Sequence, residues 1–192
     1  MARALFRLRT LLLAALLLVA VGCATTMPSP DYPRVESTAF EAHDSTPLGK
    51  QIADLALLHP GQSGFRLVAR GRQAFTARVA LTELAQRTID VQYFLWEPDA
   101  TGRLLADYLL RAADRGVRVR ILLDDVNLKE RDRSLAAFDA HPNIEIRLFN
   151  PFATRSSHLA GFLTDYDRVN HRMHNKLLVM DNAIAVVGGR NM

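Results

Sequence analysis

The order of structural patterns along the chain is the feature that most restricts its fold. From residue 72 onwards, segments with helical spacing of apolar residues alternate with short runs rich in β-branched and aromatic residues. We expect helices over residues 72–86, 101–114 and 131–140, and strands over residues 88–96, 117–123 and 144–149. Strands that alternate with helices predict an α/β fold, in which a sheet carries helices on its faces.

Cap and turn residues set the ends of several elements. A helix is predicted to begin at Pro47 with Thr46 as its N-cap, because Pro suits the first helical position and Thr accepts from a free N–H group. Thr101 is expected to cap a second helix and Gly116 to end it. Residues 65–68 are a short strand candidate. The apolar side of the first helix consists of Leu48, Ile52, Leu55 and Leu58.

The first 23 residues resemble a bacterial lipoprotein signal. Three arginines precede an uninterrupted run of apolar and small residues over 11–22, which is too short to span a bilayer and typical of a signal peptide. The single cysteine of the chain, Cys23, follows this run in the sequence Ala-Val-Gly-Cys. We expect residues 1–22 to be removed and Cys23 to carry lipid; the alternative is a plain signal peptide in which Cys23 is incidental.

The resemblance to a lipoprotein signal implies a location in the bacterial envelope, and the charge of the remaining chain does not indicate nucleic acid. Residues 23–47 hold four of the eight prolines and predict an extended tether before a domain over 48–192. The chain has 24 Lys and Arg against 20 Asp and Glu, and three of these cations lie in the signal, so the rest carries an excess of one. This small positive net charge does not indicate a surface that binds nucleic acid. Ala24 favours the outer membrane, facing the periplasm.

The stretch from residue 150 to 170 leaves two interpretations open. Four apolar residues recur at helical spacing, which predicts a helix packed on the core. The other interpretation is a surface segment that meets lipid beside the active site. These four residues are Leu159, Phe162, Leu163 and Tyr166.

The strongest chemical signal is the pattern H-x-K-x₄-D-x₆-G-G-x-N, which runs from His174 to Asn191. Alternation along a strand turns His174 and Lys176 to the same face. Asp181 and Asn182 suit a two-residue turn, and residues 183–187 predict a buried return strand. Gly188 and Gly189 lack a Cβ, so the backbone there lets a ligand approach closely.

These side chains suit a phosphate group. Lys176 and Asn191 hold anionic oxygens and stabilise charge in the transition state, and a largely neutral His174 attacks phosphorus or moves a proton. Asp181 is less secure as a phosphate residue, because a turn aspartate is common. No set of carboxylates or histidines has the spacing of metal ligands, so we expect a mechanism without metal or cofactor.

The pattern resembles the HKD signature of the phospholipase D superfamily, and further segments resemble its bacterial cardiolipin synthase branch. This resemblance implies a phospholipase D-like sheet with flanking helices and a phosphodiester substrate in a phospholipid. It implies that His174 becomes a phosphohistidine, that Lys176, Gly188, Gly189 and Asn191 bind phosphate, and that Asp181 supports the hairpin as part of the catalytic motif. The segments that carry the resemblance are residues 90–96, 116–125, 146–152 and 172–176.

The superfamily uses two motif copies, and this chain contains one. The chain stops at Met192, directly after Asn191, so we expect the N-terminal half of a two-motif fold that is inactive alone and needs a C-terminal half or a second copy. Two alternatives remain: a nuclease of the same superfamily that works as a dimer, and a truncated lipoprotein without catalysis.

Overall fold

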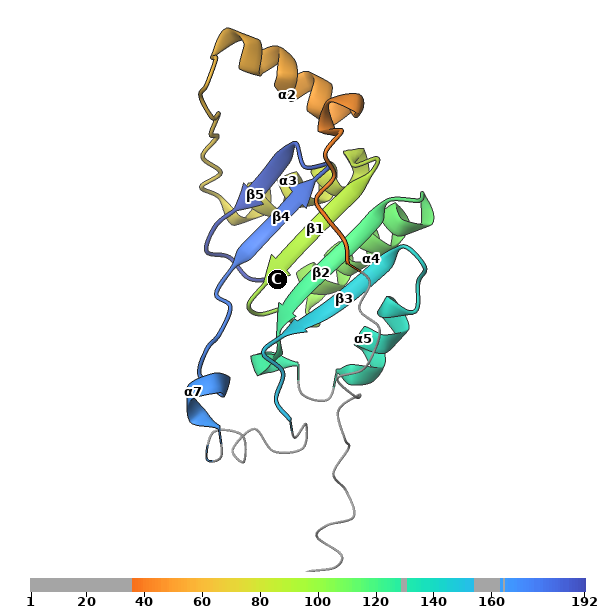
Figure 1. Ribbon diagram of the computed structural model, residues 1–192, viewed down its shortest axis with the longest axis vertical. Coiled ribbons are helices and arrows are strands. Elements are labelled where there is room, and N and C mark those ends of the chain that lie inside the picture. The colour runs from red at the N-terminus through yellow and green to blue at the C-terminus, as the bar shows by residue number, and fades with distance from the viewer. Residues whose placement is uncertain (1–35, 129–130, 154–162, 164) are drawn as a thin grey trace, which may run out of the picture.

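A computed structural model describes residues 36–128, 131–153, 163 and 165–192 (Figure 1). The predicted signal, Cys23 and the first part of the tether lie outside these residues. No helix in the described ranges is long and apolar enough to cross a membrane.

The centre of the fold is a five-stranded sheet in the order β3-β2-β1-β4-β5. The first three strands run parallel, and the last two form an antiparallel hairpin beside β1. The α/β prediction is therefore confirmed, and the three parallel strands lie where strands were predicted, although the first ends at Tyr93 instead of residue 96 and the second is shifted by one residue. The strands are β1 (Thr88–Tyr93), β2 (Arg118–Asp124), β3 (Ile144–Phe149), β4 (Lys176–Met180) and β5 (Ile184–Val187).

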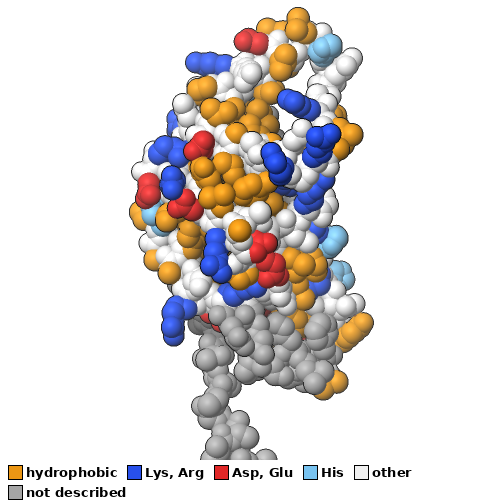
Figure 2. Space-filling model, turned by 180° about the vertical axis from the view of Figure 1, so that it is seen from behind, with side chains coloured by type: hydrophobic (Ala, Val, Ile, Leu, Met, Phe, Trp, Pro, Cys, Tyr) orange, Lys and Arg blue, Asp and Glu red, His pale blue; other side chains and the backbone are white. Residues whose placement is uncertain are grey.

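Helices α3 and α4 cover one face of the sheet (Figure 1). Seen from that side, hydrophobic side chains reach the surface in the middle and charged side chains surround them (Figure 2). Between helices and sheet lies the core, which includes Leu105, Leu109, Val91, Val119 and Leu178, all at most 1% exposed. The helices are α2 (Pro47–Leu58), α3 (Gly71–Leu84), α4 (Ala100–Asp114), α5 (Asp132–Asp139) and α7 (Tyr166–Val169), with short 3₁₀ turns η1 (His43–Ser45) and η2 (Asp125–Asn127).

The opposite face of the sheet carries polar and charged side chains. Asp90 of β1 pairs with Arg120 of β2 across this face at 2.5 Å. Arg118 and Arg120 also donate to the backbone oxygens of Thr38 and Ser37, at 2.7 and 3.0 Å. The described end of the predicted tether therefore lies against the sheet.

Helix ends follow local chemistry, with one correction. Thr46 accepts from the N–H of Gly49 at 3.0 Å and begins α2, as predicted. Helix α4 is capped by Asp99 instead of Thr101: its carboxylate accepts from Gly102 N at 2.8 Å, while the hydroxyl of Thr101 donates to the same carboxylate. A carboxylate accepts both bonds at once. Gly116 ends this segment with φ +90°, as expected.

Two expectations about apolar segments are wrong in the described residues, and one apolar helix side is only partly covered. Residues 65–68 form no strand, because no described strand pairs with them, and Phe65 is 96% exposed. Strand β5 is an edge strand, so Val187 is 73% exposed where a buried strand was expected. The apolar side of α2 is only partly covered, since Leu58 is 71% exposed.

The helix expected within 150–170 is described only at its end, as α7. Leu163 and Tyr166 are 78% and 58% exposed, so these two residues do not pack on the core as the first interpretation requires. Leu159 and Phe162 lie outside the described residues. The interpretation of a lipid-contacting segment stays a prediction.

Candidate active site

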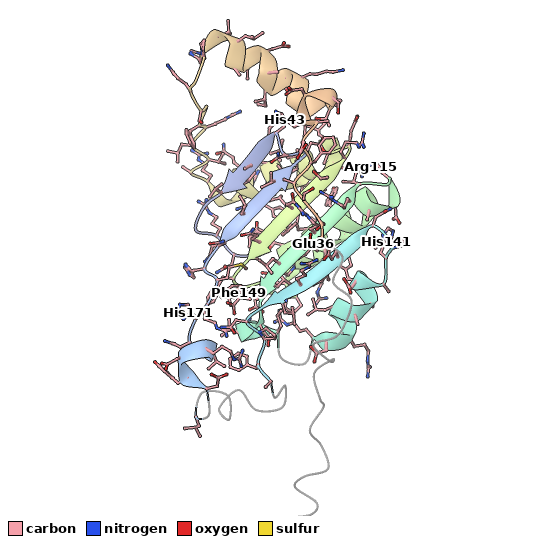
Figure 3. All side chains as sticks on the ribbon, in the orientation of Figure 1. Glu36, His43, Arg115, His141, Phe149 and His171 are labelled. Carbon is pink, nitrogen blue, oxygen red and sulfur yellow. The ribbon has the colours of Figure 1, made fainter. Side chains whose placement is uncertain are left out.

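The functional motif lies where the carboxyl ends of the parallel strands meet the start of β4. In open α/β sheets this edge is the usual place for a ligand site, because loops from several strands converge there. Phe149, at the end of β3, and His171, before β4, mark this edge in Figure 3. Phe94 follows β1 directly, and its N–H donates to the oxygen of Asn175 at 3.0 Å.

His174 and Lys176 meet around the ring of Phe94. The His174 ring lies 4.9 Å from the Phe94 ring, centroid to centroid, at an angle of 59°. The Lys176 ammonium lies 5.0 Å from the same centroid, a distance suited to a cation–π contact. The structure therefore brings together the two residues that the motif placed on one face. His174 is exposed and Lys176 is 3% exposed.

The ammonium of Lys176 is held in a poorly hydrated position. Its Nζ donates to the backbone oxygen of His174 at 2.9 Å. Burial lowers the pKa of Lys176 below its usual value, because a charged amine loses hydration there. An anion placed beside this amine would favour its charged form again.

Asn191 is bound to the segment that follows Phe94. Its Oδ1 accepts from the N–H of Leu95 at 3.3 Å, which leaves the nitrogen end of the amide as the donor. Met192 continues the contact: its N–H donates to Leu95 O at 3.2 Å, and its oxygen accepts from Glu97 N at 2.5 Å. The edge of the sheet therefore holds Asn191 together with the Phe94 loop.

Gly188 and Gly189 leave open space where a side chain would stand. A Cβ at either position would meet no heavy atom of the described residues within 4 Å. The Gly188 N–H donates to Lys176 O at 3.2 Å, which pairs it with the start of β4. The backbone at these glycines therefore has open space beside the start of β4, and the predicted approach of a ligand there stays a prediction.

Asp181 lies at the other end of β4, away from His174. It follows Lys176 by five residues, and roughly 3.3 Å per residue separates them by about 16 Å along the strand. Its fully buried carboxylate accepts from the N–H groups of Gln86, Arg87 and Thr88 at 2.7 to 3.2 Å. Asp181 and Asn182 adopt φ of 53° and 51°, which confirms the predicted turn. The structure places Asp181 as a support of the hairpin.

Sequence reasoning missed three residues that support the site. Phe94 lies within the strand predicted over 88–96, and Asp124 directly follows the strand predicted over 117–123; neither was given a role. Arg172 lies two residues before His174; its side chain is 14% exposed and pairs with Asp124 at 2.9 Å. The available signal was the pair of acids, Asp124 and Asp125, that directly follows the strand predicted over 117–123, because the carboxyl ends of parallel strands face the site.

Other charged residues near the motif make ordinary surface contacts. His171 is exposed, and Arg190 donates to the backbone oxygen of Ala69 at 2.6 Å. Within the described ranges no group of three or more His, Cys, Asp or Glu side chains is arranged to hold a metal ion.

Comparisons with known proteins cover most of the described domain. Residues 79–192 match the family described as cardiolipin synthase, PLD-like domain. The chain is 48% identical over 145 residues to cardiolipin synthase C of Escherichia coli K12, covering 76% of this chain and 31% of that protein. It is 32% identical over 127 residues to cardiolipin synthase A of Pseudomonas putida, covering 66% of this chain and 25% of that protein. The chain thus spans less than a third of the length of these relatives.

Two solved structures match parts of the chain at lower similarity. NucT from Helicobacter pylori matches with a TM-score of 0.46 and 19% identity, over 66% of this chain and 72% of that one. Nuc from Salmonella typhimurium, a phospholipase D family member, matches with a TM-score of 0.40 and 22% identity, over 60% and 62% of the two chains. The family model covers more than half of the chain and contains the whole motif from His174 to Asn191. The chain therefore belongs to the phospholipase D-like family that includes the cardiolipin synthases.

Proposed function

We propose that this chain supplies the nucleophilic half of an enzyme that cleaves phospholipid phosphodiester bonds, with transfer of the phosphatidyl group to an alcohol or to water. One observation carries the proposal: an exposed imidazole, His174, and a buried ammonium, Lys176, flank the same ring at the ligand-binding edge of the sheet. A nucleophile beside a cation is what attack on an anionic phosphodiester requires.

The reaction divides into two displacements at phosphorus. In the first, an imidazole nitrogen of His174 bonds to phosphorus while the bond from phosphorus to the leaving alcohol breaks. The leaving oxygen takes a proton from a separate acid, which the family resemblance assigns to a histidine of a second motif. In the second, water or another alcohol attacks the phosphohistidine, its proton passes to that histidine, and His174 is released. The covalent intermediate replaces one difficult step with two easier ones.

Lys176 and Asn191 stabilise the charge on the phosphate oxygens. The Lys176 ammonium has one carbonyl partner, His174 O, and little water, so a phosphate oxygen would be a strong further partner. The amide nitrogen of Asn191, whose oxygen is bound by Leu95 N, would be a further donor to the phosphate. The exposed backbone at Gly188 and Gly189 leaves room for the substrate to approach.

A phospholipid assay with this chain and a C-terminal half bearing a second motif tests the proposal. We expect phosphatidyl transfer or hydrolysis when both halves are present, none from this chain alone, and none with the His174→Ala chain as control. Chelator should have little effect. If EDTA stopped the reaction and zinc restored it, the metal-free mechanism would be wrong. Cleavage of single-stranded DNA without any phospholipid turnover would favour the nuclease alternative.

We also propose that lipid on Cys23 anchors the protein in the bacterial envelope, facing the periplasm. The anchor would hold the site near its phospholipid substrate, which supports this reading of the signal pattern. Mass spectrometry of the mature N-terminus is the test: a diacylglyceryl-modified Cys23 is expected, and Cys23→Ala should remain unlipidated. An unmodified terminus at another residue would exclude the anchor.

A further inference from the structure

The backbone before His174 is bound to a buried carboxylate on another strand. The side chain of Asp124, at the end of β2, is 0% exposed. Its Oδ2 accepts from the N–H of Met173, the residue directly before His174, at 2.7 Å. Its Oδ1 accepts from Arg172 and from Val126 N, each at 2.9 Å. Three donors therefore fix this carboxylate, and two of them belong to the segment that carries His174.

Arg172 is fixed through every nitrogen of its guanidinium group. Nε donates to Val169 O at 2.7 Å, Nη2 donates to Asn150 O at 2.9 Å, and Nη1 donates to Asp124. The guanidinium also lies over the Phe152 ring at 4.9 Å. The planar fork of arginine binds several acceptors in a set geometry, which a lysine cannot match. Arg172 therefore ties residues 172–173 to the ends of β2 and β3.

On the other side of His174, strand pairing supplies the support. Phe94 N donates to Asn175 O at 3.0 Å, and the Asn175 side chain donates to Gln92 at 2.8 Å. His174 thus lies between two fixed residues, although its own side chain is exposed. A ring that must attack in line depends on such support, since a displacement of about 1 Å can reduce a reaction rate about 100-fold.

We propose that Asp124 is a positioning residue for His174, acting through the Met173 amide, and that Arg172 holds the Asp124 carboxylate in place. This inference rests on the proposed role of His174. Asp124 does not contact the imidazole in the described structure, so it orients the nucleophile through the backbone and takes no part in proton transfer. An asparagine at position 124 would present one oxygen to two sets of donors, and its NH₂ group would face either Arg172 or Met173.

The test measures the backbone and the imidazole separately in the full 192-residue chain. Asp124→Asn is compared with Asp90→Asn, which removes the Asp90–Arg120 pair between β1 and β2, on the sheet face that α3 and α4 do not cover. Hydrogen exchange of the Met173 amide is followed by NMR. The His174 ring signal, assigned with a His174→Asn chain, is titrated with inorganic phosphate.

In Asp124→Asn we expect Met173 exchange to accelerate at least tenfold and half-saturation of the His174 signal by phosphate to rise at least threefold. Asp90→Asn should change neither beyond its effect on global stability. If Asp124→Asn does not fold, Arg172→Lys is used in its place, and we expect the same two changes to be smaller. The inference would be overturned if Asp124→Asn showed the same Met173 exchange rate and the same His174 response to phosphate as Asp90→Asn. If the wild-type His174 signal does not change when phosphate is added, the result counts against the proposed function. The exchange rate of the Met173 amide then still tests the role of Asp124.

Discussion

The two ends of strand β4 carry the same motif but serve different purposes. At its start, His174 is exposed and the Lys176 ammonium is bound by one backbone oxygen. At its end, the buried carboxylate of Asp181 accepts three backbone N–H groups and holds the hairpin to the start of β1. The fixed spacing between Lys176 and Asp181 in the motif therefore corresponds to the length of strand β4. Substitutions at the two ends should separate chemistry from stability.

The largest expected effect is on chemistry, at the start of the strand. His174→Ala should lower turnover by about 10⁴-fold or more in the two-motif enzyme, because no neighbouring side chain can replace a covalent nucleophile. The His174 side chain is exposed, so the free energy of unfolding should change by no more than about 0.5 kcal/mol. Single-turnover assay and urea unfolding measure the two quantities. Residual activity near wild type would remove His174 from the mechanism.

The next effect is on stability, at the end of the strand. Asp181→Ala leaves three backbone N–H groups without an acceptor and places alanine at φ 53°, so we expect a loss of about 3 kcal/mol in the free energy of unfolding. Asp181→Asn is the matched control, because asparagine tolerates this backbone conformation and keeps one acceptor oxygen; its loss should be smaller. Urea unfolding of both chains is the measurement. Equal losses would show that the carboxylate is not the supporting group.

Lys176 affects both chemistry and stability. Burial of its ammonium lowers the free energy of unfolding, and the same ammonium supplies the cation of the site. Lys176→Met should raise the free energy of unfolding by about 1 kcal/mol and abolish phosphate binding. Its pKa is lowered from a usual 10.5, so the unfolded state holds more protons between the lowered pKa and that value. Wild-type stability should therefore rise with pH across this interval, and Lys176→Met should lose that rise. Urea unfolding at several pH values measures the slope; a retained slope in the variant would assign it to another group.

Local patterns in the sequence predicted the strands, most helices and the turn, because alternation, caps and left-handed residues act over a few neighbours. The strand over 144–149 and the turn at Asp181 are examples, and both match the structure. Partners distant in sequence were not predictable in this way. Asp124 binds Met173, which lies 49 residues later, and no local pattern records that pairing.

Exposure was the least predictable property of apolar segments. Phe65, Leu58 and Val187 belong to patterns typical of buried elements, yet each is more than 70% exposed. A pattern shows that one side of an element is apolar, but it does not supply the partner that covers it. The same limit applies to the site. Alternation along one strand predicted that His174 and Lys176 lie together, but the role of Phe94 depends on the pairing of strands β1 and β4, which the local pattern does not record.

The smallest expected effect concerns the open backbone beside Lys176. The φ of Gly188 is not positive, and no described heavy atom lies within 4 Å of the place where a Cβ would stand, so Gly188→Ala should change the free energy of unfolding by no more than about 0.5 kcal/mol. If the substrate uses this space, the added methyl should still raise the phosphate concentration for half-saturation of the His174 signal about threefold, which corresponds to about 0.7 kcal/mol. Gly64→Ala is the control, because Gly64 also faces open space without a positive φ but lies between α2 and α3, in a segment without motif residues. Unchanged phosphate binding in Gly188→Ala would show that the substrate approaches His174 from another side, and Gly188 would then belong with Asp181 to the support of the hairpin.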